Sequence, residues 1–344
     1  MTRTRISRLL AGLLATSALA VAGCGSGDDG DSTAAGAGGG GEIALVAYST
    51  PQEVYGNELI PAFQQTPEGE GVEVTTSFAG SGDSRRAVEA GQPADFVHLP
   101  IEPDMAILAE QDLIPADYRD EPHDGSPQTS VVVFITRPGN PENVKTWDDL
   151  VAGDLEVINA NPFTSGGARW NVMAAYGQAV EAGASEQEAL DYVKRLFEHI
   201  PVQDASARDA LNTFLSGKGD VLLSYENEAV QAQNAGQDVD YVVPTSTIEI
   251  ETLDAVTTGA ANPEAAQAFR DFLRTEEAQR IWAENGYRPV DEAVLAEYEQ
   301  EFPTPETLFT IEDLGGWESV MAEFFDLDEG KITAIQRELG VAVD

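Results

Sequence analysis

The chain has 344 residues, with 60 acidic against 19 basic side chains and a formal net charge of −41. A surface of this charge argues against binding to nucleic acid and against adsorption to anionic lipid. The length allows two lobes, and the single cysteine, Cys24, excludes an intramolecular disulfide.

The N-terminus has the features of an export signal with a lipid-attachment site. It begins with positive charge, supplied by Arg3, Arg5 and Arg8. Residues 9–21 are apolar but too short to span a membrane, and "VAGC" ends at Cys24 in the pattern that precedes lipid attachment. We expect residues 1–23 to be a lipoprotein signal peptide and 24–41 a flexible tether. Cleavage removes three arginines and no acid, which changes the charge from −41 to −44. The mature protein is then extracytoplasmic and anchored through Cys24 to the outer face of the cytoplasmic membrane.

The first part of the mature chain alternates between strand and helix patterns. Strands are expected at 42–49, 72–78 and 94–99, and helices at 51–65 and 83–90. Pro51 suits the first turn of its helix. This βαβαβ order within about sixty residues predicts a parallel sheet.

The same alternation continues along the rest of the chain, without an internal repeat. Strands are expected at 130–141, 155–162, 220–225, 239–244 and 254–259, and helices at 165–181, 185–198, 206–216, from 225 onward, at 263–274 and at 276–285. The sequence therefore predicts an α/β protein.

Three strand-to-helix turns carry small residues where a helix begins: 49–51, 80–83 and 164–167. In α/β sheets such turns lie at the carboxyl ends of strands, where ligands bind. The first turn of a helix has unpaired N–H groups and a partial positive charge, so it binds anions without Lys or Arg. Ser and Gly are also ordinary caps, so each turn alone is a weak indication. The three together favour an anion site.

Five further segments follow one another along the chain: "AGSGD", "RPGNPENVKTWDDL", "NPFTSGGARWN", "YENEA" and "NGYRPV". In these segments and their order, the chain resembles the periplasmic sulfate-binding proteins of ABC importers and the related thiosulfate-binding proteins. The resemblance extends from "VAYSTPQEVY" to about "FTIEDLGGW". The resemblance implies a type II periplasmic-binding-protein fold, in which two α/β lobes close over one ligand. Lobe 1 would comprise residues 42–132 plus 243–344, and lobe 2 residues 133–242.

The resemblance also implies a site in which donors hold an unhydrated sulfate. By position, the anion-binding residues would be Ser49, Ser81, Ser165, Gly166, Gly167, Ala207 and Tyr225. Arg169 and Arg208 follow two of the turns and either stiffen them from behind or are ordinary surface residues. The chain departs from the family at Ser49, where Asp is frequent, and at Tyr225, where Trp is usual. Tyr225 either donates to the anion or only packs beneath the helix start.

A site built of donors explains selectivity. Sulfate only accepts hydrogen bonds near neutral pH, whereas phosphate carries a proton that needs an acceptor. An unpaired proton costs about 1–3 kcal/mol or more. A carboxylate in the cleft would reverse the preference, and Glu226 and Glu228, which follow Tyr225, either face solvent or brace the turn.

Other functions are less compatible with the sequence. "AGSGD" around Ser81 lacks the first glycine of a hydrolase nucleophile elbow, and His98, His123 and His199 have no motif partner. No Cys/His cluster suggests a metal. Molybdate or tungstate binding is the main alternative, since those oxyanions also need only donors. We expect a monomeric receptor for sulfate or thiosulfate that delivers it to an ABC permease, with no catalytic step and no cofactor.

Overall fold

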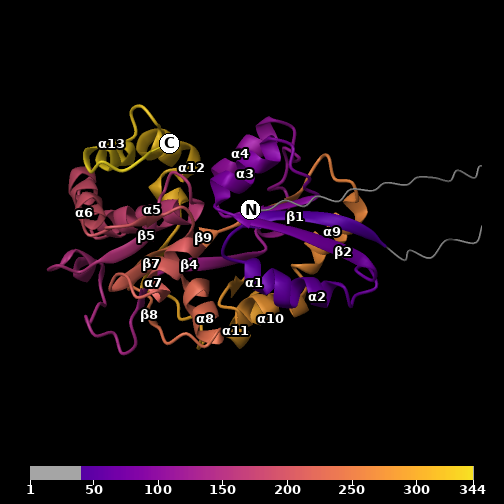
Figure 1. Cartoon of the computed structure of the whole chain (residues 1–344), viewed down its shortest axis with the longest axis horizontal. Helices are drawn as coiled ribbons and strands as arrows, with labels where there is room; N and C mark the ends of the chain where they lie inside the picture. Colours follow the sequence, from indigo (N-terminus) through magenta and orange to yellow (C-terminus); the bar gives the residue numbers. More distant parts are fainter. Residues whose placement is uncertain (1–39, 344) are drawn as a thin grey trace, which may run out of the picture. The chain divides into compact units, whose positions relative to one another are not determined.

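A computed structural model describes residues 40–343. The signal peptide, Cys24 and nearly all of the tether lie outside the described residues. The body is built on two sheets (Figure 1). No helix within residues 40–343 is long and apolar enough to cross a membrane.

The first sheet has four strands in the order β10 (Leu253–Val256), β3 (Phe96–Leu99), β1 (Gly41–Tyr48) and β2 (Val72–Ala79). The strands β2 and β3 both pair with β1 in parallel, and β10 adds antiparallel to β3. The predicted βαβαβ order is confirmed. A parallel arrangement requires helical crossovers, which is why the apolar strand residues are covered on both faces.

Helices cover the two faces of the first sheet. On one face lie α1 (Gln52–Val54), a π-helical turn (Tyr55–Leu59), α2 (Ile60–Phe63), α9 (Pro263–Phe272) and α10 (Glu276–Glu284). On the other lie α3 (Ser81–Glu89) and α4 (Glu102–Glu110). Alternate residues of β1 divide between the two cores: Leu45 packs with the first group, and Val46 with the second.

The second sheet has the order β12 (Thr307–Phe309), β9 (Ser246–Glu251), β4 (Gln128–Thr136), β7 (Val221–Tyr225), β5 (Val157–Ala160) and β6 (Gln203–Asp204). Two further strands, β8 (Asp240–Val242) and β11 (Arg288–Pro289), pair with β4. One face is covered by α5 (Gly166–Glu181) and α6 (Glu186–Glu198), and the other by α7 (Ala207–Leu215) and α8 (Glu226–Asn234). The chain is therefore an α/β protein with two lobes, as predicted.

The end of the chain packs with the second sheet. After α11 (Glu292–Glu297), β12 pairs with β9, and α12 (Gly316–Val320) and α13 (Lys331–Glu338) follow. Trp317 contacts Trp170 edge-to-face, with 4.7 Å between ring centroids. The aromatic and aliphatic side chains of this segment belong to the same core cluster as α5 and α6.

Candidate functional site

Five helices begin within a few residues of strand ends in the two sheets and present their first turns to one region. Ser81 is the first residue of α3, Ser165 is the N-cap of α5, and Ala207 is the first residue of α7. Tyr225 is the last residue of β7 and the N-cap of α8. Ser49 follows β1 just before α1. These positions lie at the carboxyl ends of strands, as the sequence predicts.

The turns of the two lobes meet at Ser81 and Gly166. The Gly166 N–H donates to Ser81 Oγ over 2.8 Å, and the Trp170 indole N–H donates to the carbonyl of Pro100 over 2.6 Å. The space is too small for a side chain, because a Cβ atom on Gly166 would lie 2.6 Å from Ser81 Oγ. A Cβ on Gly80 would lie 3.0 Å from the carbonyl oxygen of Thr164. Bare backbone is therefore what allows the two lobes to approach here.

Tyr225 points its hydroxyl at the first turn of α5. A Cβ atom on Gly167 would lie 3.4 Å from that hydroxyl. The residue is 1 % exposed, and within the described residues its hydroxyl has no hydrogen-bond partner. Burial raises the pKa of Tyr225 well above its ordinary value, so the phenol stays protonated and neutral. A buried polar atom without a partner beside a helix start is a feature that a bound group would satisfy.

The remaining predicted residues reach the same region through their neighbours. Arg208 donates from Nη2 to the carbonyl of Thr50 over 3.0 Å, which joins the start of α7 to the turn after β1. Ser49 and Ala207, one residue before Thr50 and Arg208, are both buried. The structure thus gathers the predicted residues at one place between the lobes, while their roles as anion ligands stay a prediction.

Arg208 is neutralised by carboxylates. It donates to both oxygens of Glu228, over 3.2 and 2.7 Å, and also pairs with Glu53 of the first lobe. Burial alone would lower the pKa of Arg208, but Glu228 and Glu53 raise it, so the guanidinium stays charged. Glu228 is fully buried, as is Glu226, which pairs with Arg288 over 2.8 Å. The question left open by the sequence is answered: neither glutamate faces solvent. Glu228 braces the turn after β1 through Arg208, and Glu226 ties the start of α8 to β11.

Comparison with known proteins agrees with this arrangement. Residues 43–288 match the family model described as bacterial extracellular solute-binding protein. The chain belongs to this family. It is 37 % identical over 305 residues to a sulfate-binding protein of Synechococcus elongatus, covering 86 % of this chain and 87 % of the relative. It is 33 % identical to a thiosulfate-binding protein of Pseudomonas aeruginosa, covering 81 % and 88 % respectively.

Solved structures give the same result. The sulfate-binding protein SubI of Mycobacterium tuberculosis superimposes with a TM-score of 0.80 at 43 % identity, covering 83 % of this chain and 99 % of SubI. The periplasmic binding protein P5PA, at 18 % identity and a TM-score of 0.61, shares the fold and covers 87 % of this chain and 99 % of its own. The family is one of solute-binding receptors rather than enzymes.

In this solute-binding protein, Arg169 bonds to the turn between β5 and α5. Its Nε donates to the carbonyl of Pro162 over 2.8 Å, and its guanidinium lies 5.6 Å from the ring of Phe325. Burial lowers the pKa of Arg169, and the nearby carboxylate of Asp104 opposes that shift. The charge of Arg208 is therefore shared with two carboxylates, whereas Arg169 is held by the Pro162 carbonyl and the Phe325 ring.

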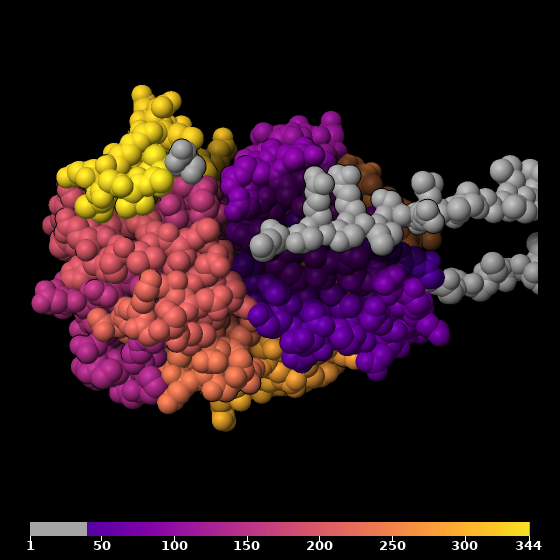
Figure 2. Space-filling view, in the orientation of Figure 1, coloured from indigo at the N-terminus to yellow at the C-terminus, as the bar shows by residue number. Residues whose placement is uncertain are grey.

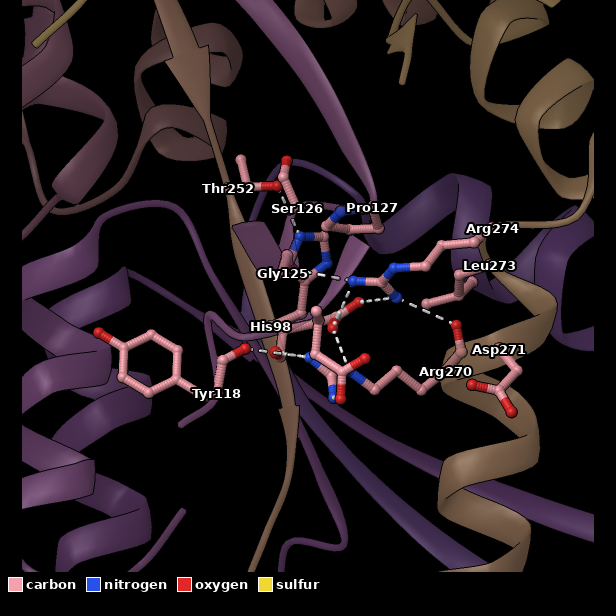
Figure 3. Close-up of polar contacts among 12 residues, drawn as sticks. His98, Tyr118, Gly125, Ser126, Pro127, Thr252, Arg270, Asp271, Leu273 and Arg274 are labelled. Carbon is pink, nitrogen blue, oxygen red and sulfur yellow. Dashed lines mark hydrogen bonds and ion pairs between the residues drawn. The ribbon is translucent and has the colours of Figure 1, made fainter. Parts of the chain in front are cut away.

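The segments that join the lobes are fixed to the first lobe (Figure 3). Thr252 is the one residue between β9 of the second sheet and β10 of the first, and its hydroxyl bonds His98 Nε2 over 2.8 Å. Arg274 donates to the carbonyl of Gly125 over 3.0 Å and to the buried Asp254. Burial lowers the pKa of His98 to about 4, so the ring is neutral near pH 7. These contacts hold both joining segments on the first-lobe side.

Sequence reasoning missed Thr50 and Glu53. Within residues 40–343 the buried Thr50 hydroxyl has no hydrogen-bond partner, and Glu53 supplies the first-lobe half of the ion pair with Arg208. Neither residue has a local signal in the sequence. A Thr before Pro51 is typical of an ordinary turn, and a Glu in a first helical turn is typical of an interaction with the helix dipole.

Among residues 40–343, no three His, Cys, Asp or Glu side chains group closely enough to hold a metal ion.

Proposed function

We propose that this chain is an extracytoplasmic receptor that captures sulfate or thiosulfate between its lobes and delivers the anion to an ABC permease. The observation that carries the proposal is the meeting of helix starts from both lobes at Ser81 and Gly166. Beside them lies the Tyr225 hydroxyl, which has no hydrogen-bond partner in the part of the chain that the structure describes. The names of relatives that the chain covers almost completely support the same ligands.

The chemistry of the site suits a dianion that only accepts hydrogen bonds. Backbone N–H groups of the first helical turns and the serine hydroxyls donate, and the helix dipoles add a partial positive charge. Ser81 and Gly166, now bonded to each other, would each turn to the ligand. The lobes meet along an extended boundary (Figure 2), so that closure excludes water and strengthens these bonds.

The seven anion-binding residues stay those named from the sequence: Ser49, Ser81, Ser165, Gly166, Gly167, Ala207 and Tyr225. Arg169 and Arg208 would support the turns from behind. For the lobes we propose the predicted boundaries with two amendments. Residues 128–132 and 246–251 belong to β4 and β9 of the second sheet and are assigned to lobe 2. Residues from Thr307 onward also pack with the second sheet and are assigned to lobe 2.

We further propose that the receptor is a monomer held to the outer face of the cytoplasmic membrane through Cys24. The support is the N-terminal sequence. One cysteine that carries several acyl chains exceeds the threshold for stable attachment. Mass spectrometry of the membrane fraction should find a mature N-terminus at an acylated Cys24, and Cys24→Ser should release the protein. An unmodified N-terminus, or one elsewhere, contradicts the anchor.

Calorimetry with sulfate, thiosulfate, molybdate and phosphate on one protein sample tests the ligand. Sulfate or thiosulfate should bind most tightly. Molybdate or tungstate also needs only donors and is the second candidate. Tighter binding of molybdate than of either sulfur anion would make that candidate correct.

A further inference from the structure

A hydrogen bond joins the two lobes one helical turn beyond the start of α5. The indole N–H of Trp170 donates to the carbonyl of Pro100 over 2.6 Å. Trp170 belongs to α5 of the second lobe, whereas Pro100 directly follows β3 of the first. Both residues are buried. Trp170 is therefore more than a packing residue, because its one polar group is directed across the boundary between the lobes.

The helix α5 contacts the same first-lobe segment in two successive turns. Gly166 and Trp170 are four residues apart and lie on one face of the helix. A Cβ atom on Gly166 would lie 3.0 Å from the side chain of Pro100 and 3.1 Å from that of Ile101. The first turn of α5 supplies predicted anion donors. The bond of Trp170 therefore holds that turn in place without using any of its N–H groups.

The indole ring of Trp170 is fixed from behind by the C-terminal segment. Trp317 of α12 packs against it edge-to-face, with 4.7 Å between the ring centroids and 80° between the ring planes. The helix α12 also lies beside α4 of the first lobe (Figure 1). Because packing already orders the ring, forming the bond to Pro100 loses little further side-chain entropy.

A hydrogen bond between two lobes depends on how far the lobes are apart. In a hinge motion each lobe moves as a unit, so opening separates α5 from the segment after β3. The indole N–H and the carbonyl can then both bond to water. In the closed form they are buried and satisfy each other, and losing either partner is unfavourable only there. This contact therefore differs between the two forms, as any group that shifts such an equilibrium must.

We propose that Trp170 is a positioning residue that favours the closed form through its bond to Pro100 and thereby slows the release of the anion. The inference rests on the proposed function, since it assumes that the lobes close over an anion. Trp170 acts without contacting the ligand. It holds the donors of the first α5 turn against the first lobe.

The test compares the wild type with Trp170→Phe and a matched control, Trp147→Phe. Trp147 is also buried and belongs to the same core cluster as Trp170. Its indole N–H donates to the carbonyl of Ser246 over 2.8 Å, but both of these residues lie in the second lobe. The two variants lose the same side-chain volume and the same kind of bond. Thermal unfolding without sulfate measures this shared cost.

The Kd for sulfate should rise about 5- to 150-fold in Trp170→Phe, because the closed form alone loses a donor to a buried carbonyl. Stopped-flow measurements should assign the change to faster dissociation, with the association rate within about twofold of the wild type. In Trp147→Phe the Kd should not change, although the melting temperature falls. An unchanged Kd in Trp170→Phe, or an equal rise in both variants, would overturn the inference.

A measurement on the wild type does not depend on how well the variants fold. In protein labelled with 15N at tryptophan, the indole N–H of Trp170 should exchange with solvent more slowly when sulfate is bound. The indole N–H of Trp147 should exchange equally with and without sulfate. If Trp170→Phe does not fold, this comparison decides, and exchange of Trp170 that sulfate does not slow would overturn the inference.

The two proposals fail in different ways. A wild type that binds neither sulfate nor thiosulfate would reject the proposed function. A wild type that binds sulfate, with an affinity and an indole exchange that do not depend on Trp170, would overturn only the role of Trp170.

Discussion

At the scale of single residues, Gly166 shows how a substitution can separate stability from binding. Alanine has the higher helix propensity, by about 1 kcal/mol. At Gly166, however, the added Cβ would lie 2.6 Å from Ser81 Oγ and 3.0 Å from Pro100. At Gly167 the nearest atom, the Tyr225 hydroxyl, is 3.4 Å away, an ordinary contact.

Gly166→Ala should therefore weaken sulfate binding about 10-fold or more while the melting temperature stays equal or rises, because the lobes can no longer close fully. Gly167→Ala is the matched control and should have a smaller effect on affinity. Calorimetry and thermal unfolding measure the two quantities. If Gly166→Ala binds as tightly as the wild type, the close approach of the turns is not needed for binding.

His98 contributes a pH dependence with a definite sign. Its pKa is lowered by burial from 6.5 to about 4, so the unfolded chain takes up a proton before the folded chain does. The contribution of His98 to the free energy of unfolding is fully present above about pH 6.5. It is lost as the pH falls towards 4, and the total loss is about 3 kcal/mol.

Replacing His98 by Gln removes this titration. Chemical unfolding of both proteins between pH 4 and 8 should show a steeper loss of stability for the wild type over that range. Parallel curves would mean that His98 does not titrate as a neutral, buried ring.

The sequence predicted the position of the turns but not the direction of their side chains. Small residues after strands marked the helix starts near Ser81, Ser165 and Ala207, because capping and glycine placement are local signals. The pairing of Arg208 with Glu53 joins residues that are 155 positions apart. Such contacts depend on tertiary packing, which local patterns do not encode.

At the scale of elements, Arg208 of α7 joins α8 and α1 through two acids, Glu228 and Glu53, that differ in burial. Glu228 is fully buried, whereas the side chain of Glu53 is 46 % exposed. Breaking a buried pair leaves an uncompensated charge and typically costs 3–5 kcal/mol, whereas a largely exposed pair contributes about 0–1 kcal/mol.

Glu228→Gln should therefore lower the free energy of unfolding by about 3–5 kcal/mol. Glu53→Gln should leave the free energy of unfolding nearly unchanged and weaken sulfate binding by about fivefold at most, since this pair joins the two lobes. Urea unfolding and calorimetry measure the two effects. Equal destabilisation by both variants would show that burial does not separate the two pairs.

Most helices and strands of the two sheets were predicted, whereas β6, β9, β11, α4 and the elements after residue 290 were not. The strand β9 has the sequence "STIEIE" and carries two glutamates. In α4, "EPDMAILAE", the apolar residues stand in one run instead of recurring at helical spacing. Their structure is set by neighbours: β9 pairs with both β4 and β12. Pairing partners far along the chain override local propensity.

At the scale of the whole molecule, the charge of −41 opposes the arrival of a dianion. Most receptors for charged ligands use complementary charge to accelerate association, and added salt slows them. Here the long-range field is repulsive and is screened within about 10 Å at 0.1 M salt. The anion must therefore approach against this repulsive field before the short-range hydrogen-bond donors of the site can bind it.

The association rate of sulfate should therefore rise, by about twofold or more, as chloride is increased from low to physiological ionic strength. Stopped-flow tryptophan fluorescence can follow this, with sucrose as a control for viscosity and crowding. A rate that falls with salt would mean that the helix starts produce an attractive field that outweighs the surface.

The position of β12 and Trp317 in the second lobe also determines when that lobe can fold. Its sheet contains residues from 128 to 309, and Trp317 covers Trp170 in its core. The parallel pairs of the first sheet, β1 to β3, need only the first third of the mature body. A chain emerging from its N-terminus can pair these strands early, but the second lobe waits for its last forty residues. A chain that ends near residue 306 should expose an apolar face over α5 and aggregate, rather than yield a half-active receptor.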